Sequence, residues 1–192
     1  MDNLLLAEKD KYQKIWEIDS YRKYSPAMKH VIETVDRCKQ KGFNTILDAG
    51  CGTGRATEAF ITAGLMAVGI DITLTAVDPK IREKYPKHFY EECLWSIEDN
   101  VPPFDLVFCV DVLEHIPLEM LNDTMQCLSI LTTHEFFAKI SLVKDSYGKL
   151  ISQDLNLSIY HADYWITLFK KYYQSVEIIE NKALYITLRG IK

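Results

Sequence analysis

The stretch TILDAGCGTGR, residues 45–55, carries most of the fold prediction. TILDA is a short apolar run that ends next to an acid, and a glycine-rich turn and the helix-like stretch RATEAFITAG follow it. Continuous apolar runs are typical of strands buried in a parallel sheet, and glycines let a backbone turn tightly and approach a ligand. We therefore expect a strand–turn–helix unit with a ligand-binding turn at the carboxyl end of the strand.

The same alternation of strands and helices continues along the chain. Further strands are expected at MAVGID (66–71), HFYEECLW (88–95), FDLVFCVDV (104–112) and EFFAKISLV (135–143), with helices after Pro117 and over residues 162–173. SVEIIE and ALYITLR then form a closing antiparallel pair across a polar turn. The prediction is an α/β fold: a Rossmann-like, doubly wound, mostly parallel seven-stranded sheet with a C-terminal antiparallel hairpin.

The first 42 residues are expected to be helical and to form an N-terminal cap. Ser25 is placed to cap a helix, Pro26 suits its first position, and Gly42 can end it in the left-handed conformation. An apolar stripe follows helical spacing in this segment: Met28, Val31, Ile32, Val35 and Cys38.

The composition excludes several classes of protein. The 192 residues are 48% hydrophobic and 26% charged, as in an ordinary globular domain, so disordered and collagen-like chains are excluded. The net charge is −5, which argues against tight binding to a long nucleic acid. The longest apolar run, LVFCV, is too short to cross a membrane, and MDNLLLAEKDK lacks the features of a signal peptide. We expect a cytoplasmic protein that does not bind membranes.

Five cysteines without a CxxC pair indicate neither a zinc site nor a disulfide framework. Glu114 and His115 are adjacent, and neither HxxxH nor ExxH spacing occurs. No metal is therefore expected.

Glycine spacing bears on the cofactor. Gly50, Gly52 and Gly54 do not match GxGxxG, whose third glycine would fall at Arg55, and no GK[ST] is present. Asp48 precedes the glycines, which suits a cationic ligand better than a phosphate. Asp71 ends the second strand, where a carboxylate can accept two hydrogen bonds from a ribose diol. The alternatives are a carboxylate that braces the loop at Asp48, and a helix cap or a surface acid at Asp71.

These segments together resemble a known family. DAGCGTGR after the first strand, GIDIT at the second and FDLVFCVDVLEHIP around the fourth resemble the class I S-adenosylmethionine-dependent methyltransferases over roughly residues 43–190. DVLEHIP is typical of the branch that contains ubiquinone-biosynthesis and small-molecule O-methyltransferases. The resemblance implies a cap at residues 1–42 and a cofactor-binding domain at residues 43–192.

The resemblance also implies positions for S-adenosylmethionine. Its methionine part would lie on the loop residues Asp48, Ala49, Gly50, Cys51, Gly52 and Gly54. Its ribose would bind Asp71, its adenine would lie between Ile72 and the pair Cys93 and Leu94, and its sulfonium would lie beside Cys109, Val110 and Asp111. The chain has ECLW where many relatives have an Asp and a small residue, so Glu92 or a backbone group would contact the adenine amino group.

Three residues are candidates for deprotonating a methyl acceptor: His115, Asp111 and His161. Histidine titrates near neutral pH, which suits a general base, although each histidine could instead have a structural role. Trp16 and Trp95 are candidates for the pocket wall.

The predicted function is methyl transfer to an oxygen or nitrogen of a small-molecule or sugar-like acceptor. The alternatives are a tRNA or other nucleic-acid methyltransferase, and a protein that binds S-adenosylmethionine without catalysis. The sequence does not indicate the oligomeric state.

Overall fold

A computed structural model describes residues 2–23, 25–97 and 101–192. Within them, seven strands form one sheet in the order β3-β2-β1-β4-β5-β7-β6. The strands are β1 (Thr45–Ala49), β2 (Met66–Asp71), β3 (Phe89–Glu91), β4 (Phe104–Val110), β5 (Thr132–Ser141), β6 (Ser175–Asn181) and β7 (Tyr185–Ile191). The first five strands pair in parallel, and β7 pairs antiparallel with both β5 and β6. The predicted fold class is confirmed.

The strand order reverses between β1 and β4, which are direct neighbours in the sheet. The connection after β1 leads toward one edge of the sheet and the connection after β4 leads toward the other edge. The carboxyl ends of these two parallel strands therefore border an open crevice. The glycine-rich turn leaves β1 at this point, and the segment 111–116 leaves β4 there.

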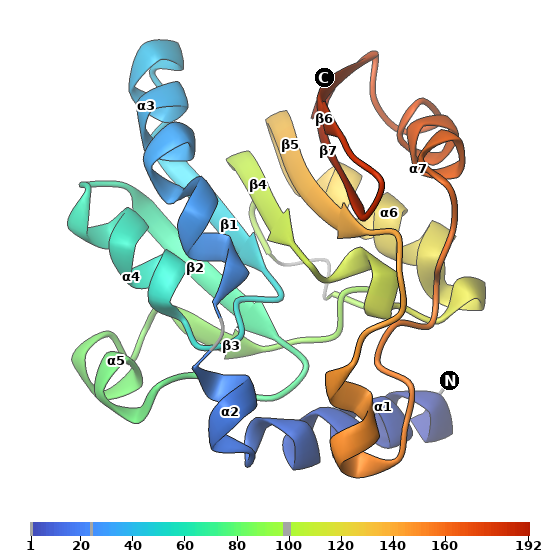
Figure 1. Cartoon of the computed structure of the whole chain (residues 1–192). Helices are drawn as coiled ribbons and strands as arrows, with labels where there is room; N and C mark the ends of the chain where they lie inside the picture. The colour runs from blue at the N-terminus through green and yellow to red at the C-terminus, as the bar shows by residue number, and fades with distance from the viewer. Residues whose placement is uncertain (1, 24, 98–100) are drawn as a thin grey trace.

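Helices cover both faces of the sheet (Figure 1). On one face, α3 (Val31–Lys41) and α4 (Arg55–Thr62) bury apolar side chains against Ile46 and Phe108. On the other face, α6 (Leu121–Ile130) and α7 (Ala162–Phe169) pack on a larger core that includes Val107 and Leu188. The short helix α5 (Pro79–Lys84) packs through Ile81 against Phe89 of β3.

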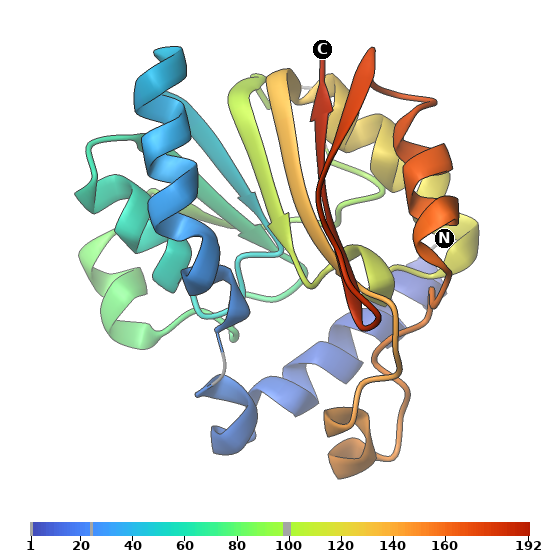
Figure 2. The same ribbon diagram turned by 45° about the horizontal axis from the view of Figure 1, so that its top comes forward.

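The first two helices lie across the carboxyl ends of the strands rather than on a face of the sheet (Figure 2). They are α1 (Asp2–Trp16) and α2 (Asp19–Arg22), and α1 lies against the 3₁₀ helix η4 (Tyr147–Ile151). Arg22 holds them in place because its guanidinium donates to the carbonyl of Thr75 at 2.8 Å. Lys9 of α1 also pairs with Glu91 of β3.

Several predicted boundaries were wrong by a few residues. Residues 26–30 form a 3₁₀ helix, η1 (Pro26–His30), before α3 begins, and Ser25 makes no side-chain capping bond. The left-handed Gly42 does end α3, with a φ of 71°. In the predicted stripe, Met28 and Ile32 are exposed, Ile32 by 77%, because a change from 3₁₀ to α geometry rotates the buried face.

The predicted strands and the C-terminal helix also differ in length. β3 is only three residues long, and Trp95 lies in a turn beyond it. β5 begins three residues earlier than predicted, at Thr132, because the backbone pairs with Phe104 on one side. Helix α7 ends at Phe169, before Tyr172. Two further 3₁₀ helices, η2 (Leu113–His115) and η3 (Leu118–Met120), precede α6.

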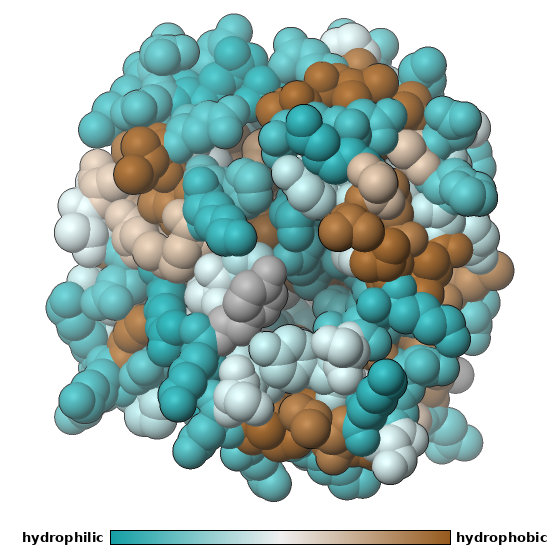
Figure 3. Space-filling view, in the orientation of Figure 1, coloured by the Kyte–Doolittle hydropathy of each residue, from teal (hydrophilic) through white to brown (hydrophobic). Residues whose placement is uncertain are grey.

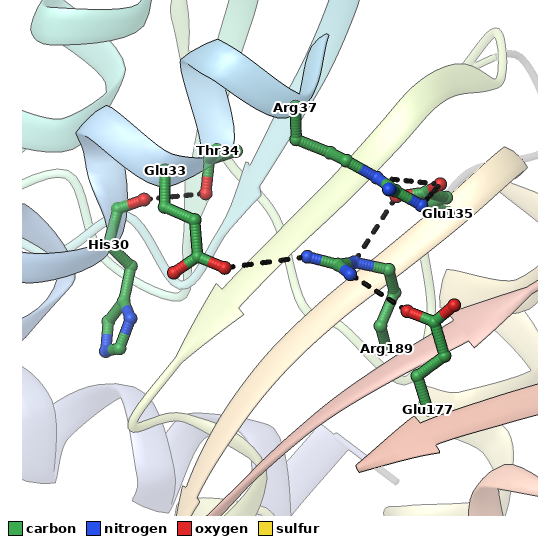
Figure 4. Close-up of polar contacts among 7 residues, drawn as sticks. All are labelled: His30, Glu33, Thr34, Arg37, Glu135, Glu177 and Arg189. Carbon is green, nitrogen blue, oxygen red and sulfur yellow. Dashed lines mark hydrogen bonds and ion pairs between the residues drawn. The ribbon is translucent and has the colours of Figure 1, made fainter. Parts of the chain in front are cut away.

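A network of charged side chains joins α3 to the sheet away from the crevice (Figure 4). Glu135 of β5 is buried and accepts hydrogen bonds from Arg37 of α3, at 2.6 Å from Nη2. Arg189 of β7 forms ion pairs with Glu135 at 3.4 Å and with Glu177 of β6 at 2.9 Å. The two arginines therefore compensate the buried charge of Glu135.

In the described ranges, no helix combines the length and the apolar character needed to cross a membrane.

Candidate active site

The turn after β1 requires glycine at its first position. Gly50 has a φ of +76°, and a Cβ atom added there would lie 2.4 Å from Cγ2 of Val112. The N–H groups of Gly50 and Cys51 donate to the carbonyl of Ile70 at 2.8 and 2.9 Å, which ties the turn to β2. Because glycine has no side chain, the backbone of this turn faces the crevice directly, and a ligand can approach it closely.

Asp71 lies at the end of β2, beside this turn. Its Oδ2 accepts from the N–H of Gly52 at 2.9 Å, and its Oδ1 accepts from the N–H of Thr73 at 3.2 Å. Burial raises the pKa of Asp71 to about 6, although these backbone donors oppose the rise. The carboxylate is thus held in one orientation at the wall of a narrow cavity.

The narrow cavity combines an apolar wall with a few polar groups. Its wall includes Ile72, Leu94 and Trp95, together with Tyr12 and Trp16 of α1. Flat apolar walls next to a carboxylate at a strand end suit a nucleoside, whose base is planar and whose ribose carries a diol.

Two hydrogen-bond donors of α1 in this wall are buried without a partner among the described residues. They are the hydroxyl of Tyr12 and Nε1 of Trp16. An unpaired buried polar group costs about 1–3 kcal/mol, so these donors indicate a ligand that accepts hydrogen bonds. The ring of Trp16 also covers Gly52, where an added Cβ would lie 3.1 Å from the indole.

A second, open cavity of about 360 Å³ adjoins the narrow one. The two cavities share five lining residues: Trp16, Tyr21, Gly50, Asp111 and His115. Residues of β5, of η4 and of the loops on both sides of η4 are among the others that line the open cavity. In Figure 3, hydrophilic surface surrounds separate hydrophobic patches on this side of the molecule. The arrangement provides room for two ligands in contact with each other.

Asp111 stands between the cavities in an unusual backbone conformation, with a φ of +54°. Its carboxylate pairs with Lys139 of β5, and its N–H donates to the carbonyl of Lys139 at 2.9 Å. Non-glycine residues with positive φ are costly and concentrate at functional sites. The ion pair therefore fixes Asp111 at the junction of the two cavities.

His115 also lines both cavities. Its Nδ1 lies 3.1 Å from the carbonyl oxygen of Leu155. A carbonyl only accepts, so Nδ1 carries the hydrogen and Nε2 of the neutral ring has a free lone pair. Burial lowers the pKa of His115, which keeps the ring neutral. His115 is thus able to take a proton at Nε2.

The structure brings some predicted site residues into the cavity walls. Those that line a cavity are Gly50, Cys51, Gly52, Asp71, Ile72, Leu94, Val110, Asp111 and His115, together with Trp16, Glu92 and Trp95.

Other predicted residues lie behind the walls or outside them. Asp48 is buried and accepts a hydrogen bond from Thr57 of α4 at 2.6 Å, and burial raises its pKa to about 7. Ala49, Cys93 and Cys109 are buried. Gly54 lines neither cavity, and a Cβ atom added there would meet Phe89 and Val77. His161 is exposed at the start of α7 and lines neither cavity.

Sequence reasoning missed Tyr12, Tyr21, Lys139 and Asn156, all of which line a cavity. A lysine inside the apolar run EFFAKIS was a usable signal, because a charged residue at the end of a buried strand needs a partner. The other three belong to helices and loops without any motif, and only the tertiary structure places them.

Fold and site together are those of an α/β protein whose cavity suits a nucleoside-bearing ligand at the carboxyl ends of β1, β2 and β4. The comparisons with known proteins indicate which family within this class the chain resembles. A family model described as "Methyltransferase domain" matches residues 47–134.

Three similar proteins extend that match. The chain is 29% identical to a ubiquinone biosynthesis O-methyltransferase of Actinobacillus pleuropneumoniae serotype 7, over 79% of this chain and 71% of the relative. It is 31% identical to the enzyme of that name from Haemophilus ducreyi, over 45% of this chain and 40% of the relative. A crystal structure of magnesium protoporphyrin IX methyltransferase from Synechocystis PCC 6803, with bound S-adenosylhomocysteine, superposes with a TM-score of 0.64 at 16% identity. That match covers 95% of this chain and 93% of the neighbour.

These matches support the predicted resemblance to the class I S-adenosylmethionine-dependent methyltransferases.

Proposed function

We propose that this chain transfers a methyl group from S-adenosylmethionine to an oxygen of a small-molecule acceptor. The observation that carries the proposal is the pair of adjoining cavities that share Gly50, Asp111 and His115. The cofactor occupies the narrow cavity and reaches the shared residues, and the acceptor occupies the open cavity. Oxygen is preferred over nitrogen because the curated relatives are named O-methyltransferases.

The residues of the narrow cavity fit S-adenosylmethionine. Asp71 accepts hydrogen bonds from the ribose diol, and Ile72, Leu94 and Trp95 pack on the adenine. The unpaired donors of Tyr12 and Trp16 offer hydrogen bonds to acceptor atoms of the cofactor. When bound, S-adenosylmethionine supplies a methyl group that is activated by a sulfonium centre.

Asp48 acts indirectly in this proposal. Its bond to Thr57 joins the start of the glycine-rich turn to α4, and it lines neither cavity. A buried carboxyl in this position braces the loop rather than contacting the ligand. Of the two hypotheses made for Asp48 from the sequence, the proposal therefore takes the loop-bracing one.

The protein contributes orientation and a proton acceptor. Trp16 and Tyr21 line both cavities and so flank the place where the two ligands would meet. Nε2 of His115 accepts the proton of the acceptor hydroxyl, and the fixed Asp111–Lys139 pair orients the acceptor. Holding two reactants in line is worth about 7–11 kcal/mol in favourable cases, so alignment is the larger contribution. His161 is too exposed to serve as the base.

The test is calorimetric titration of the purified protein with S-adenosylhomocysteine, with NADH as the contrasting ligand. We expect micromolar binding of S-adenosylhomocysteine, no binding of NADH, and a loss of affinity of roughly 100-fold in Asp71→Ala, because two hydrogen bonds to a charged group are lost. A folded protein that does not bind S-adenosylhomocysteine contradicts the proposal. A screen with S-adenosylmethionine then compares small hydroxyl compounds with tRNA, and methylation of tRNA alone contradicts the acceptor class.

The cap at residues 1–42 and the cytoplasmic location remain predictions of the sequence. The packing of α3 on the sheet suggests that α1 and α2 alone act as the cap, and the bonds of Arg22 and Lys9 support a fixed position for them.

A further inference from the structure

One residue that lines the open cavity has an amide oxygen without a hydrogen-bond partner among the described residues. Asn156 lies in the loop after η4 and is only 8% exposed. Its Nδ2 donates to the carbonyl of Val143 at 2.7 Å, which settles the orientation of the amide. Its Oδ1 is buried and has no partner within the described part of the chain, and the residue is one of those that line this cavity.

Glu114 presents a second such atom in the same wall. It is 1% exposed, and its Oε1 accepts from the N–H of Ser141 at 2.9 Å. Its Oε2 is buried and, across residues 2–23, 25–97 and 101–192, has no hydrogen-bond partner. The carbonyl of Glu114 accepts from the N–H groups of Leu157 and Ser158 at 2.8 and 2.9 Å. These backbone bonds hold Glu114 beside the loop that carries Asn156.

The two unpaired oxygens differ in what they offer to a ligand. Burial, and secondly the charge of Asp111, raise the pKa of Glu114 to about 8, so its carboxyl group carries a proton at neutral pH. Since Oε1 already accepts from Ser141, the proton resides on Oε2, which becomes a donor. Oδ1 of Asn156 only accepts. A donor and an acceptor in one wall match a hydroxyl group, which accepts one hydrogen bond and donates another.

Other titratable groups surround Glu114 and influence its protonation. They are Asp111, His115, Lys139 on β5, Cys109 on β4, Tyr12 on α1 and Tyr21 on α2.

Aromatic rings also line this cavity. The rings of Trp16 and Tyr21 lie 4.6 Å apart between centroids, and those of Tyr21 and Tyr147 lie 5.5 Å apart, in both cases edge to face. Such a wall packs well against a ring.

We propose that Glu114 and Asn156 position the methyl acceptor and select a neutral, ring-bearing hydroxyl compound over the corresponding carboxylate. A carboxylate has no hydrogen to give to Oδ1 of Asn156, whereas a hydroxyl group has one. This inference rests on the proposed function, because it assigns the open cavity to the acceptor.

The test uses matched pairs of probes that differ only in this group. The aromatic pair is 4-methylphenol and 4-methylbenzoate, and the sugar pair is methyl β-D-glucopyranoside and methyl β-D-glucuronopyranoside. Binding is measured by saturation-transfer NMR with S-adenosylhomocysteine present, and methyl transfer is measured by S-adenosylhomocysteine release. We expect the hydroxyl member of one pair to be preferred by at least 10-fold, and the pair that responds distinguishes an aromatic from a sugar acceptor.

Two variants examine the positioning residues themselves. Asn156→Leu should raise the KM for the preferred hydroxyl compound at least 10-fold while the affinity for S-adenosylhomocysteine stays within 3-fold. Glu114→Gln keeps a donor but cannot ionise, so the rise in KM that we expect for the wild-type protein above about pH 8 should disappear in this variant. Asn181→Leu and Glu119→Gln, which make the same changes at exposed positions, serve as controls.

The outcomes separate this inference from the proposed function. If S-adenosylhomocysteine does not bind, both fail. If S-adenosylhomocysteine binds, three results refute the inference alone. They are a preference for the carboxylates, no binding of any probe, and two variants that keep the wild-type KM and pH profile. A requirement for Mg²⁺ that Glu114→Gln abolishes also refutes it, since Glu114 would then be a cation ligand.

Discussion

Tyr12→Phe should change stability and cofactor affinity in opposite directions. Tyr12 is one of the residues that line the narrow cavity, and its hydroxyl is buried with no partner among the described residues. Burial raises the pKa of Tyr12 well above its ordinary value, so the hydroxyl stays neutral and remains a donor. The substitution removes this hydroxyl and leaves the ring, which packs edge to face against His115 at 5.9 Å.

The size of both effects follows from the cost of an unpaired polar group. Leaving a buried hydroxyl unpaired costs about 1–3 kcal/mol, so its removal should stabilise the ligand-free protein by about 1 kcal/mol. For a domain of this length, that raises Tm by about 2–4 °C. The cofactor, in contrast, loses a hydrogen bond that relieved the same cost, so its affinity should fall by about 1–2 kcal/mol, or roughly 10-fold.

Thermal unfolding without ligand and calorimetric titration with S-adenosylhomocysteine measure the two effects. Tyr90→Phe is the matched control, because it removes an exposed hydroxyl bonded to the carbonyl of Lys87. That control should change stability by less than about 0.5 kcal/mol and affinity not at all. A Tyr12→Phe protein that is less stable, or that binds S-adenosylhomocysteine as tightly as the wild type, would refute the reasoning.

Three further predictions concern the frame of the site. Burial raises the pKa values of Asp48 and Glu114 in the folded state, so the folded protein binds more protons than the unfolded protein between about pH 4 and 8. The free energy of unfolding should therefore fall as the pH rises through that window, by a few kcal/mol at most. Urea titrations at pH 5, 7 and 8.5 measure this change. A flat pH profile contradicts the assignment. Gly50→Ala should cost at least about 2 kcal/mol and abolish S-adenosylhomocysteine binding, because its Cβ would meet Val112 at 2.4 Å and its φ is positive; a normal urea midpoint argues against this. Glu135→Gln should destabilise the protein by about 3–5 kcal/mol, since two arginines lose their buried partner, but leave S-adenosylhomocysteine affinity in the folded protein unchanged; weakened binding would show that the network reaches the site.

Much of the frame was predictable because local patterns encode it. TILDA and MAVGID are strands at the predicted residues, since an apolar run of that length between turn residues has few alternatives. The element ends were less predictable. Residues 26–30 have a helical pattern, yet they form a 3₁₀ helix, and the start of β5 depends on its pairing with β4.

The candidate site divides along the same line. Gly50, Asp71 and His115 were predictable because each follows a strand closely in sequence, and parallel strands bring their carboxyl ends to one edge. Asp48 and His161 illustrate the limit: a motif position or a titratable side chain does not indicate where that side chain points. One turns toward Thr57, and the other faces solvent.

By itself, the sequence determined the α/β sheet, the glycine turn and the carboxylate at the end of β2, because these depend on residues that are close together along the chain. Only the tertiary structure decided that Tyr12 and Trp16 line the narrow cavity and that Glu114 and Asn156 both line the open one. The physical reason is that these contacts join segments far apart in sequence, and their placement depends on how helices and loops pack over the sheet. The unpaired polar atoms that indicate ligands appear only when that packing is known.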